Sequence, residues 1–278
     1  MDRAQAFEGI RKSIAAGDLA AVGPQVAGIA ASAADEPLVL LTCLSLLRSV
    51  GETETAETVL GMIAASLRAD PSAALETARG LRGLGYRREA HAALAALPAD
   101  DAVERERMAA LHGMGEHADA VAAYGRIAEP TVDDDVLAAE AFCSLGDFAS
   151  ADALAARLME EMPSDFRAGR CRCSVLLRRG LSREAGDLVK AALKADKRSA
   201  DANALAAYFM WMSGKTAAAG GYAAKAVRAD PGHVDAMEIL ALCLIEKGKR
   251  DNARIIAGAI NEQAPGHDAV MRILDACR

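Results

Sequence analysis

Residues 203–233, "NALAAYFMWMSGKTAAAGGYAAKAVRADPGH", align without a gap with residues 237–267, "MEILALCLIEKGKRDNARIIAGAINEQAPGH". The two stretches share a glycine, an alanine and a proline at a distance of 34 residues, in the pairs Gly214 and Gly248, Ala219 and Ala253, and Pro231 and Pro265. A fixed period of this length indicates repeated supersecondary units that stack on one another. The period therefore has to be followed along the rest of the chain.

The glycine of this pattern recurs eight times, with spacings of 34, 34, 30, 31, 34, 34 and 34 residues, at Gly17, Gly51, Gly85, Gly115, Gly146, Gly180, Gly214 and Gly248. Five residues after it stands Val22 in the first repeat and otherwise alanine, at Ala56, Ala90, Ala120, Ala151, Ala185, Ala219 and Ala253. Four residues before it stands Ser13 in the first repeat and otherwise a large apolar residue, at Leu47, Leu81, Leu111, Phe142, Leu176, Met210 and Leu244. Seventeen residues after it in the last four repeats, proline stands at Pro163, Pro231 and Pro265, with Lys197 as the exception.

Each recurring residue has a physical role in a pair of helices. A glycine ends the first helix of the pair, because a left-handed backbone is accessible without strain only where there is no Cβ. An alanine lets the second helix approach the first closely, and a proline ends the second helix. The alanine- and leucine-rich composition, with 52% hydrophobic but only 4% aromatic residues, also favours helices over a β-sandwich.

This pattern resembles the tetratricopeptide repeat family over nearly the whole chain, although small residues replace many of the family's bulky aromatics. The resemblance implies an all-α, right-handed superhelical solenoid of about eight antiparallel helix pairs, close to one superhelical turn, followed by a C-terminal capping helix over residues 268–278. We expect one solenoid over residues 1–278, with repeats at residues 3–36, 37–70, 71–100, 101–131, 132–165, 166–199, 200–233 and 234–267.

Two features interrupt the regular stack. Pro98 and Pro130 shorten the second helices of repeats three and four, so we expect a change of pitch near residues 97–133 and a seam between an N-terminal and a C-terminal half. The final stretch, "DAVMRILDACR", carries Val270, Ile273, Leu274 and Cys277 at helical spacing. Its apolar face is expected to cover the end of the stack.

The positions 10, 6 and 3 residues before each glycine form one continuous face of the first helix. In the family that this sequence resembles, this face lines the concave groove where ligands sit. We call these residues the first-helix stripe, and they are Phe7, Arg11, Ile14, Leu41, Ser45, Arg48, Leu75, Arg79, Arg82, Arg105, Ala109, His112, Val136, Glu140, Cys143, Arg170, Ser174, Leu177, Ala204, Tyr208, Trp211, Glu238, Leu242 and Ile245.

The stripe holds six arginines and no lysine in a chain of net charge −7. Arginine binds carboxylates in a bidentate manner, and Trp, Tyr and Arg frequently carry binding energy at interfaces. The predicted peptide-binding residues are Arg11, Arg48, Arg79, Arg82, Arg105, Arg170, Tyr208 and Trp211, with Met210 in the core and Phe209 beside the groove. The alternative is that Trp211 packs as core and that the arginines are solvated or paired with neighbouring acids.

The family's two-carboxylate clamp requires Lys or Arg and Asn at set positions in three successive repeats. This chain offers Ala109 or Ser174 where the asparagine should stand, so the clamp is not expected. We expect His112 and His117, on either side of a turn, to be surface histidines, and the pairs Arg88-Glu89 and Arg183-Glu184 to be solvated.

Several functional classes are disfavoured. The pI near 5.4 argues against nucleic-acid binding, and no segment has the ~18 apolar residues of a membrane span. The N-terminus has no apolar signal core, and six cysteines without framework spacing indicate reduced thiols in a cytoplasmic protein. Cys171-x-Cys173 lacks the further ligands of a metal site, and no catalytic or cofactor motif is present, so we expect neither an enzyme nor a cofactor.

Two hypotheses about function remain. The first is a non-catalytic adaptor or scaffold that binds a peptide or protein segment in the concave groove, and an acidic segment is one candidate for this ligand. The second is a structural protein that self-assembles, or a fixed subunit of a larger complex, and that uses convex or end surfaces.

Overall fold

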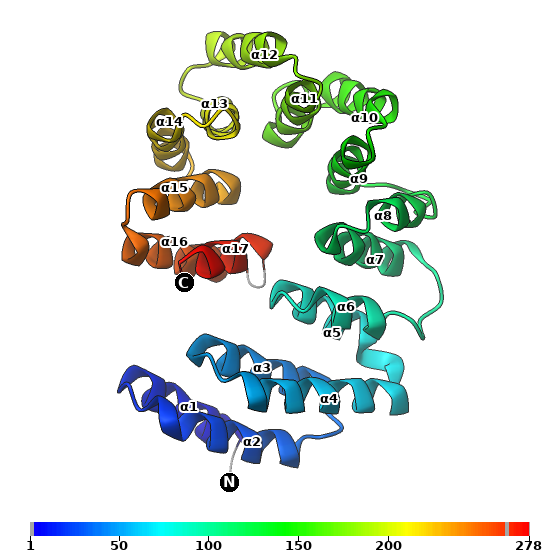
Figure 1. The fold of residues 1–278 in the computed structure, drawn as a ribbon, viewed down its shortest axis with the longest axis vertical. Helices are drawn as coiled ribbons and strands as arrows, with labels where there is room; N and C mark the ends of the chain where they lie inside the picture. The colour runs from blue at the N-terminus through cyan, green and yellow to red at the C-terminus, as the bar shows by residue number, and fades with distance from the viewer. Residues whose placement is uncertain (1–2, 265–266, 278) are drawn as a thin grey trace. The chain divides into compact units, whose positions relative to one another are not determined.

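The structure is a computed structural model that describes residues 3–264 and 267–277. All regular secondary structure in these residues is helical, with 17 α-helices and two single-turn 3₁₀ helices (Figure 1). Sixteen α-helices form eight consecutive pairs, and α17 (Asp268–Ala276) follows them. The predicted all-α fold of eight helix pairs and a terminal helix is therefore confirmed. Pro265 and Arg278, which belong to the predicted last repeat and capping helix, lie outside the described residues.

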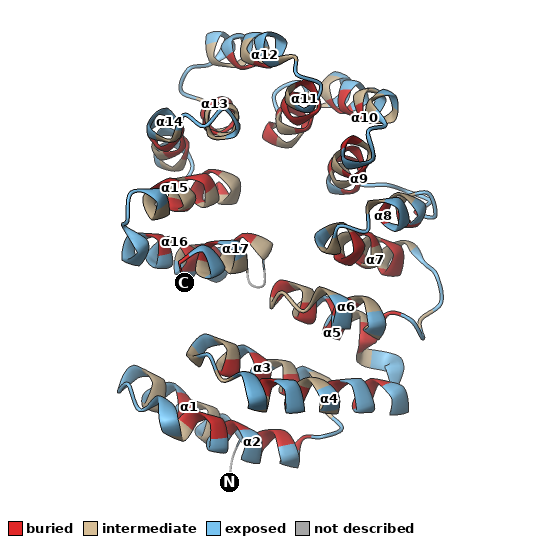
Figure 2. Ribbon diagram, in the orientation of Figure 1, coloured by how far each residue is buried: buried red, intermediate tan, exposed pale blue. Residues whose placement is uncertain are grey.

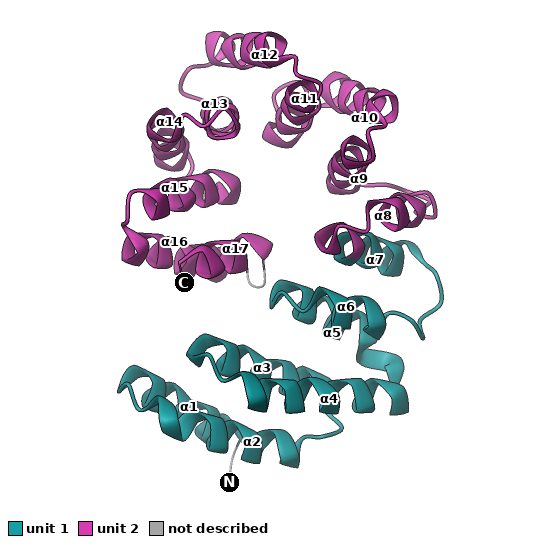
Figure 3. Cartoon of the chain, in the orientation of Figure 1, with its two compact units in different colours: residues 1–110 teal, residues 111–278 magenta. Residues whose placement is uncertain are grey.

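The chain divides into two compact units, residues 1–110 and 111–278 (Figure 3). The division falls within residues 97–133, where the sequence predicts a change of pitch, and the pitch itself stays a prediction. Unit 1 contains α1 (Arg3–Ala15), η1 (Leu19–Ala21), α2 (Val22–Ser32), α3 (Pro37–Val50), α4 (Thr53–Ala69), η2 (Pro71–Ala73), α5 (Ala74–Gly83), α6 (Arg87–Ala93) and most of α7 (Asp101–Met114).

Unit 2 begins in the last turn of α7. Its further helices are α8 (His117–Tyr124), α9 (Val132–Leu145), α10 (Phe148–Glu161), α11 (Phe166–Arg178), α12 (Ser182–Ala195), α13 (Ala200–Met212), α14 (Thr216–Ala229), α15 (Val234–Glu246), α16 (Arg250–Gln263) and α17. The second helices α6 and α8 have 7 and 8 residues, whereas α10, α12, α14 and α16 have 14 each. The predicted shortening before Pro98 and Pro130 is therefore confirmed.

The turn inside each helix pair depends on the recurring glycine. Within the described residues, positive φ values occur only at these eight glycines, between +70° and +84°. In every pair the glycine N–H donates to the carbonyl three residues earlier, and the next N–H donates to the carbonyl four residues before the glycine. In the seventh pair these bonds are 2.9 Å to Trp211 O and 2.8 Å to Met210 O. This is the Schellman arrangement, which satisfies the last carbonyls of the first helix.

Within each unit, the core lies between the helices of a pair and between successive pairs. All eight residues that stand five positions after the glycine are buried: Val22, Ala56, Ala90, Ala120, Ala151, Ala185, Ala219 and Ala253. Four residues before the glycine, Leu47, Leu81, Leu111 and Leu176 are buried, whereas Phe142, Met210 and Leu244 are half-buried. The alanines therefore set how closely the two helices of a pair approach each other.

The layer of first helices is packed more tightly than the layer of second helices in unit 2. Extensive contacts join α9 to α11, α11 to α13, α13 to α15 and α15 to α17, while no comparable contact between described residues joins α10 to α12 or α12 to α14. Buried residues accordingly concentrate on the first helices (Figure 2). In the terminal helix, Ala269, Ile273 and Cys277 are buried against α15 and α16, as the capping prediction requires.

The role of the recurring alanine can be tested in α14. We expect Ala219→Leu to destabilise the protein by about 1–3 kcal/mol, because a larger side chain at a fully buried helix contact forces the two helices apart. The exposed neighbour Ala218 provides the matched control, and Ala218→Leu should change the free energy of unfolding by less than about 0.5 kcal/mol. Urea unfolding followed by circular dichroism measures both. Equal effects of the two substitutions would contradict the assigned role.

Candidate functional site

The first-helix stripe keeps its register because its last member precedes the glycine by three residues. The carbonyl of that member, for example Arg82 or Trp211, accepts the glycine N–H. Each first helix therefore ends at a fixed point relative to the side chains of the stripe.

In unit 1, two stripe arginines share one buried acid. Arg82 Nε donates to a carboxylate oxygen of Glu106, and Arg79 Nε lies 3.9 Å from the other oxygen. The Glu106 side chain is only 6% exposed, whereas that of Arg79 is 55% exposed. One carboxylate thus faces two guanidinium groups, and that of Arg79 remains largely exposed.

The other arginines of unit 1 have different surroundings. The guanidinium of Arg48 lies over the ring of Tyr86, 5.4 Å from its centroid, in a cation–π contact. Arg105 pairs with Asp101 one turn earlier on α7, at 3.6 Å, and Arg11 is exposed. The interpretation that the arginines are paired with neighbouring acids therefore describes Arg82 and Arg105, whereas Arg11 and most of Arg79 face solvent.

In unit 2, the stripe forms a polar network across successive first helices. Glu140 on α9 lies 3.6 Å from His112 Nε2 and 3.6 Å from Arg170 Nη1 on α11. Burial lowers the pKa of Arg170, but the charges of Glu140 and Asp235 outweigh this effect and the pKa is raised overall. Arg170 therefore already interacts with the acidic residues Glu140 and Asp235 of unit 2.

The aromatic residues of the stripe are also engaged with their neighbours. Burial raises the pKa of Tyr208, and a hydrogen bond with Ser174 partly offsets this. Trp211 is half-buried and packs, with Tyr208 and Met210, against a cluster that includes Ala219 and Ala223. The packing interpretation of Trp211 is thus met in part, since its side chain is neither sealed nor fully exposed.

The two histidines that were expected at the surface are partly covered by their neighbours. His112 and His117 are both half-buried, and their rings meet edge to face with centroids 5.1 Å apart. The two residues lie on either side of the turn at Gly115, His112 three residues before it and His117 two residues after it, so the turn brings their rings together. The predicted solvated pairs Arg88-Glu89 and Arg183-Glu184, in contrast, are exposed.

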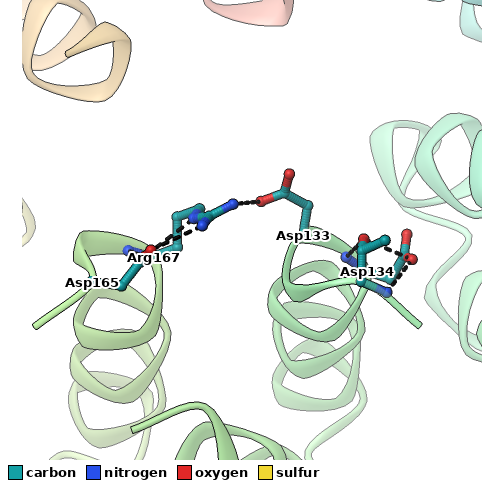
Figure 4. A network of polar contacts seen from close by, with 5 residues as sticks. Asp133, Asp134, Asp165 and Arg167 are labelled. Atoms are coloured by element: carbon teal, nitrogen blue, oxygen red, sulfur yellow. Dashed lines mark hydrogen bonds and ion pairs between the residues drawn. The ribbon is translucent and has the colours of Figure 1, made fainter. Parts of the chain in front are cut away.

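A second polar network, which the sequence did not reveal, joins the starts of α9 and α11 (Figure 4). Asp165 caps α11 by accepting the Arg167 N–H at 2.7 Å, and the Arg167 guanidinium donates both back to Asp165 and across to Asp133 at 3.2 Å. Thr131 and Asp134 form a capping box at the start of α9. The available signal was the 34-residue spacing of Asp133 and Arg167.

The cysteines do not form a reactive site. All six are free and buried, and burial raises the pKa of Cys43 to about 11 and those of Cys171 and Cys173 to about 12. Thiols with such pKa values are protonated near neutral pH and are poor nucleophiles. Across the described part of the chain, no group of three or more His, Cys, Asp or Glu side chains could hold a metal ion.

The comparisons with known proteins bear on the fold. No family model matches the sequence, and no curated protein matches it significantly. Among solved structures, the chain is similar to TTC0263, a thermophilic TPR protein of Thermus thermophilus, with 16% identity, a TM-score of 0.43 and coverage of 62% of this chain and 96% of that one. The chain is also similar to a tetratricopeptide repeat protein of Parabacteroides merdae, with 14% identity and a TM-score of 0.47. This match covers 87% of this chain and 98% of that one.

The TPR domain of P58(IPK) is matched at 13% identity with a TM-score of 0.34, over 100% of this chain and 97% of that one. Because these scores are low, the interpretation of the surfaces rests on the chain's own geometry.

No helix in the described residues is long and apolar enough to cross a membrane.

The network at the start of α11 predicts a dependence of stability on pH. The hydrogen bond from Arg167 holds the pKa of Asp165 below its usual range. The resulting stabilisation is therefore present above the unfolded-state pKa of about 3.9 and is lost as the pH falls through the lower, folded-state value. We expect Asp165→Asn, which keeps a capping side chain, to cost about 1 kcal/mol at neutral pH and progressively less below about pH 4.

Urea unfolding between neutral and acidic pH measures this difference. Asp119→Asn, at an exposed position of α8, is the control and should leave the pH profile unchanged. An Asp165→Asn penalty of the same size at every pH would contradict the role of the Arg167 pair.

These three solved structures are named as tetratricopeptide repeat proteins, the family that the repeat pattern of this sequence resembles.

Proposed function

We propose that this protein is a cytoplasmic, non-catalytic scaffold that binds an acidic segment of a partner protein on the first-helix stripe of unit 1. The observation that carries the proposal is the excess of guanidinium groups there. Glu106 faces both Arg79 and Arg82, and Arg79 remains largely exposed. Arg79 can bind a carboxylate of the partner in a bidentate manner. The loss of side-chain entropy on binding would be small, because Arg79 is already partly oriented by Glu106.

The neighbouring stripe residues support binding of a peptide in particular. Leu41 and Leu75 are half-buried beside the arginines and offer apolar surface between the charges. The guanidinium of Arg48 lies over the ring of Tyr86, and this contact restrains a long side chain before any ligand binds. Apolar contacts flanked by cations suit an extended segment in which carboxylates alternate with apolar side chains.

Unit 2 is the less favourable place for an acidic ligand on the stripe. Arg170 is already paired with Glu140, and Tyr208 is hydrogen-bonded to Ser174. A ligand there would have to replace existing contacts. In this proposal Arg170, Tyr208 and Trp211 contribute mainly to the packing of unit 2.

The test is fluorescence anisotropy with a labelled dodecapeptide of alternating Glu and Leu, compared with the Gln and Leu peptide. We expect the acidic peptide to bind more tightly and the double variant Arg11→Glu, Arg79→Glu to weaken it by about tenfold or more, which is about 1.4 kcal/mol. The control is Arg68→Glu with Arg88→Glu, which reverses two exposed arginines on second helices of the same unit.

An equal loss in the two double variants would mean that only net charge matters, and it would overturn the proposed site. Equal binding of the acidic and the amide peptide would overturn the proposed ligand.

The alternative function, self-assembly or a fixed place in a larger complex, is favoured by one observation. Ile255 on the second helix α16 is 72% exposed, which is unusual for a large aliphatic side chain. Light scattering would support this alternative if the protein forms a concentration-dependent oligomer that Ile255→Lys abolishes. The alternative also requires that the protein does not bind the acidic peptide.

A further inference from the structure

A cleft of about 620 Å³ lies in unit 2, between the glycine turn of the sixth helix pair and that of the seventh. Its apolar lining consists of Leu177, Phe209 and Met212. Its polar lining includes three cations, Arg178, Arg183 and Lys215, and no carboxylate. None of these residues except Leu177 belongs to the first-helix stripe, so the cleft is a separate surface.

The floor of the cleft includes Phe209, which lies close to Gly186 on α12. A Cβ at Gly186 on α12 would lie 3.4 Å from Phe209 Cζ, so the absence of a side chain lets the ring pack closely onto this helix. Met212, one turn further on α13, is 49% exposed and extends the apolar floor towards solvent. Methionine is flexible and polarisable, and it adapts to side chains of different shape.

The cations around this floor are not neutralised by acids lining the cleft. The contact of Arg178 is with a hydroxyl, since its Nη1 donates to Ser144 Oγ at 3.3 Å. The acid that follows Arg183 by one turn, Asp187, does not line the cleft; it is hydrogen-bonded to Lys190 at 2.9 Å, and the charges of Lys190 and Arg183 both contribute to lowering its pKa. A local positive patch thus surrounds an apolar floor in a chain whose net charge is −7.

We propose that this cleft binds a short acidic segment of a partner protein whose central apolar side chain enters between Phe209 and Met212. Carboxylates on either side of that side chain then pair with Arg178, Arg183 and Lys215. An apolar floor fits an amino-acid side chain better than a phosphate backbone, and the chain's net charge disfavours nucleic acid and anionic membranes. The cleft would be a second binding site, independent of the stripe in unit 1.

The probe is the labelled hexapeptide Asp-Glu-Phe-Leu-Asp-Glu, measured by fluorescence anisotropy against the intact chain. Two comparison peptides separate the contributions: one replaces the acids by Asn and Gln, and the other replaces Phe-Leu by Ser-Ser. We expect saturable binding of the first peptide and binding weaker by about tenfold or more for both others, because charge and apolar contact are both required.

The diagnostic variant is Arg183→Glu with Lys215→Glu, which should lower the affinity for the hexapeptide by about tenfold or more. Both side chains lie at the start of a second helix, where an added negative charge is tolerated by the helix dipole, so the fold should not suffer. Lys197→Glu with Arg198→Glu, exposed in the loop before α13, gives the same change in net charge and should have less than about a twofold effect.

Met212→Ser tests the floor without altering charge, and it too should weaken binding. The Arg11→Glu, Arg79→Glu variant should bind the hexapeptide normally, so that failure of the cleft and failure of the stripe in unit 1 are distinguishable. Absence of saturable binding to the natural chain, or equal losses in the two charge-reversal pairs, would overturn the proposal.

Discussion

The left-handed glycine turn inside each helix pair is the constraint on which the rest of the structure depends. At eight positions the backbone has a φ near +70° to +84°, and two hydrogen bonds join the end of the first helix to the turn. A side chain at these positions would oppose that conformation. Because the turn fixes where the first helix ends, it also fixes which residues face the second helix, which face the next pair, and which form the stripe.

The same register produces two different surfaces in the two units. In unit 2, the tightly packed first helices bring Glu140 between His112 and Arg170, so that the stripe satisfies much of its own charge. In unit 1, one buried carboxylate serves two arginines and leaves positive charge facing solvent. Residues at the same repeat positions therefore make structural contacts in unit 2 and form a candidate binding face in unit 1. Charge balance between neighbouring repeats, rather than position alone, decides between these roles.

Sequence reasoning predicted the helix pairs well because each depends on a local rule. The glycine spacing gave every first-helix end, and Pro98 and Pro130 gave the two short second helices. It could not predict contacts that depend on distances between helices. The sharing of Glu106, the edge-to-face pair of His112 and His117, and the packing of Phe209 on Gly186 all arise from how neighbouring repeats meet. The eight candidate site residues were predicted from their repeat positions on the first helices, but whether each is free to bind depends on those contacts.

The most direct test of the glycine constraint is semisynthesis at Gly248, where φ is +71° and an added Cβ would meet no atom within 4 Å. Cys243 provides a natural ligation junction, so a synthetic segment of residues 243–278 can carry glycine, L-alanine or D-alanine at this position. The measurement is the urea midpoint of the three full-length proteins. D-alanine should be more stable than glycine, because it favours the left-handed region, and L-alanine less stable by about 1 kcal/mol. Equal midpoints for the two alanine enantiomers would contradict the account.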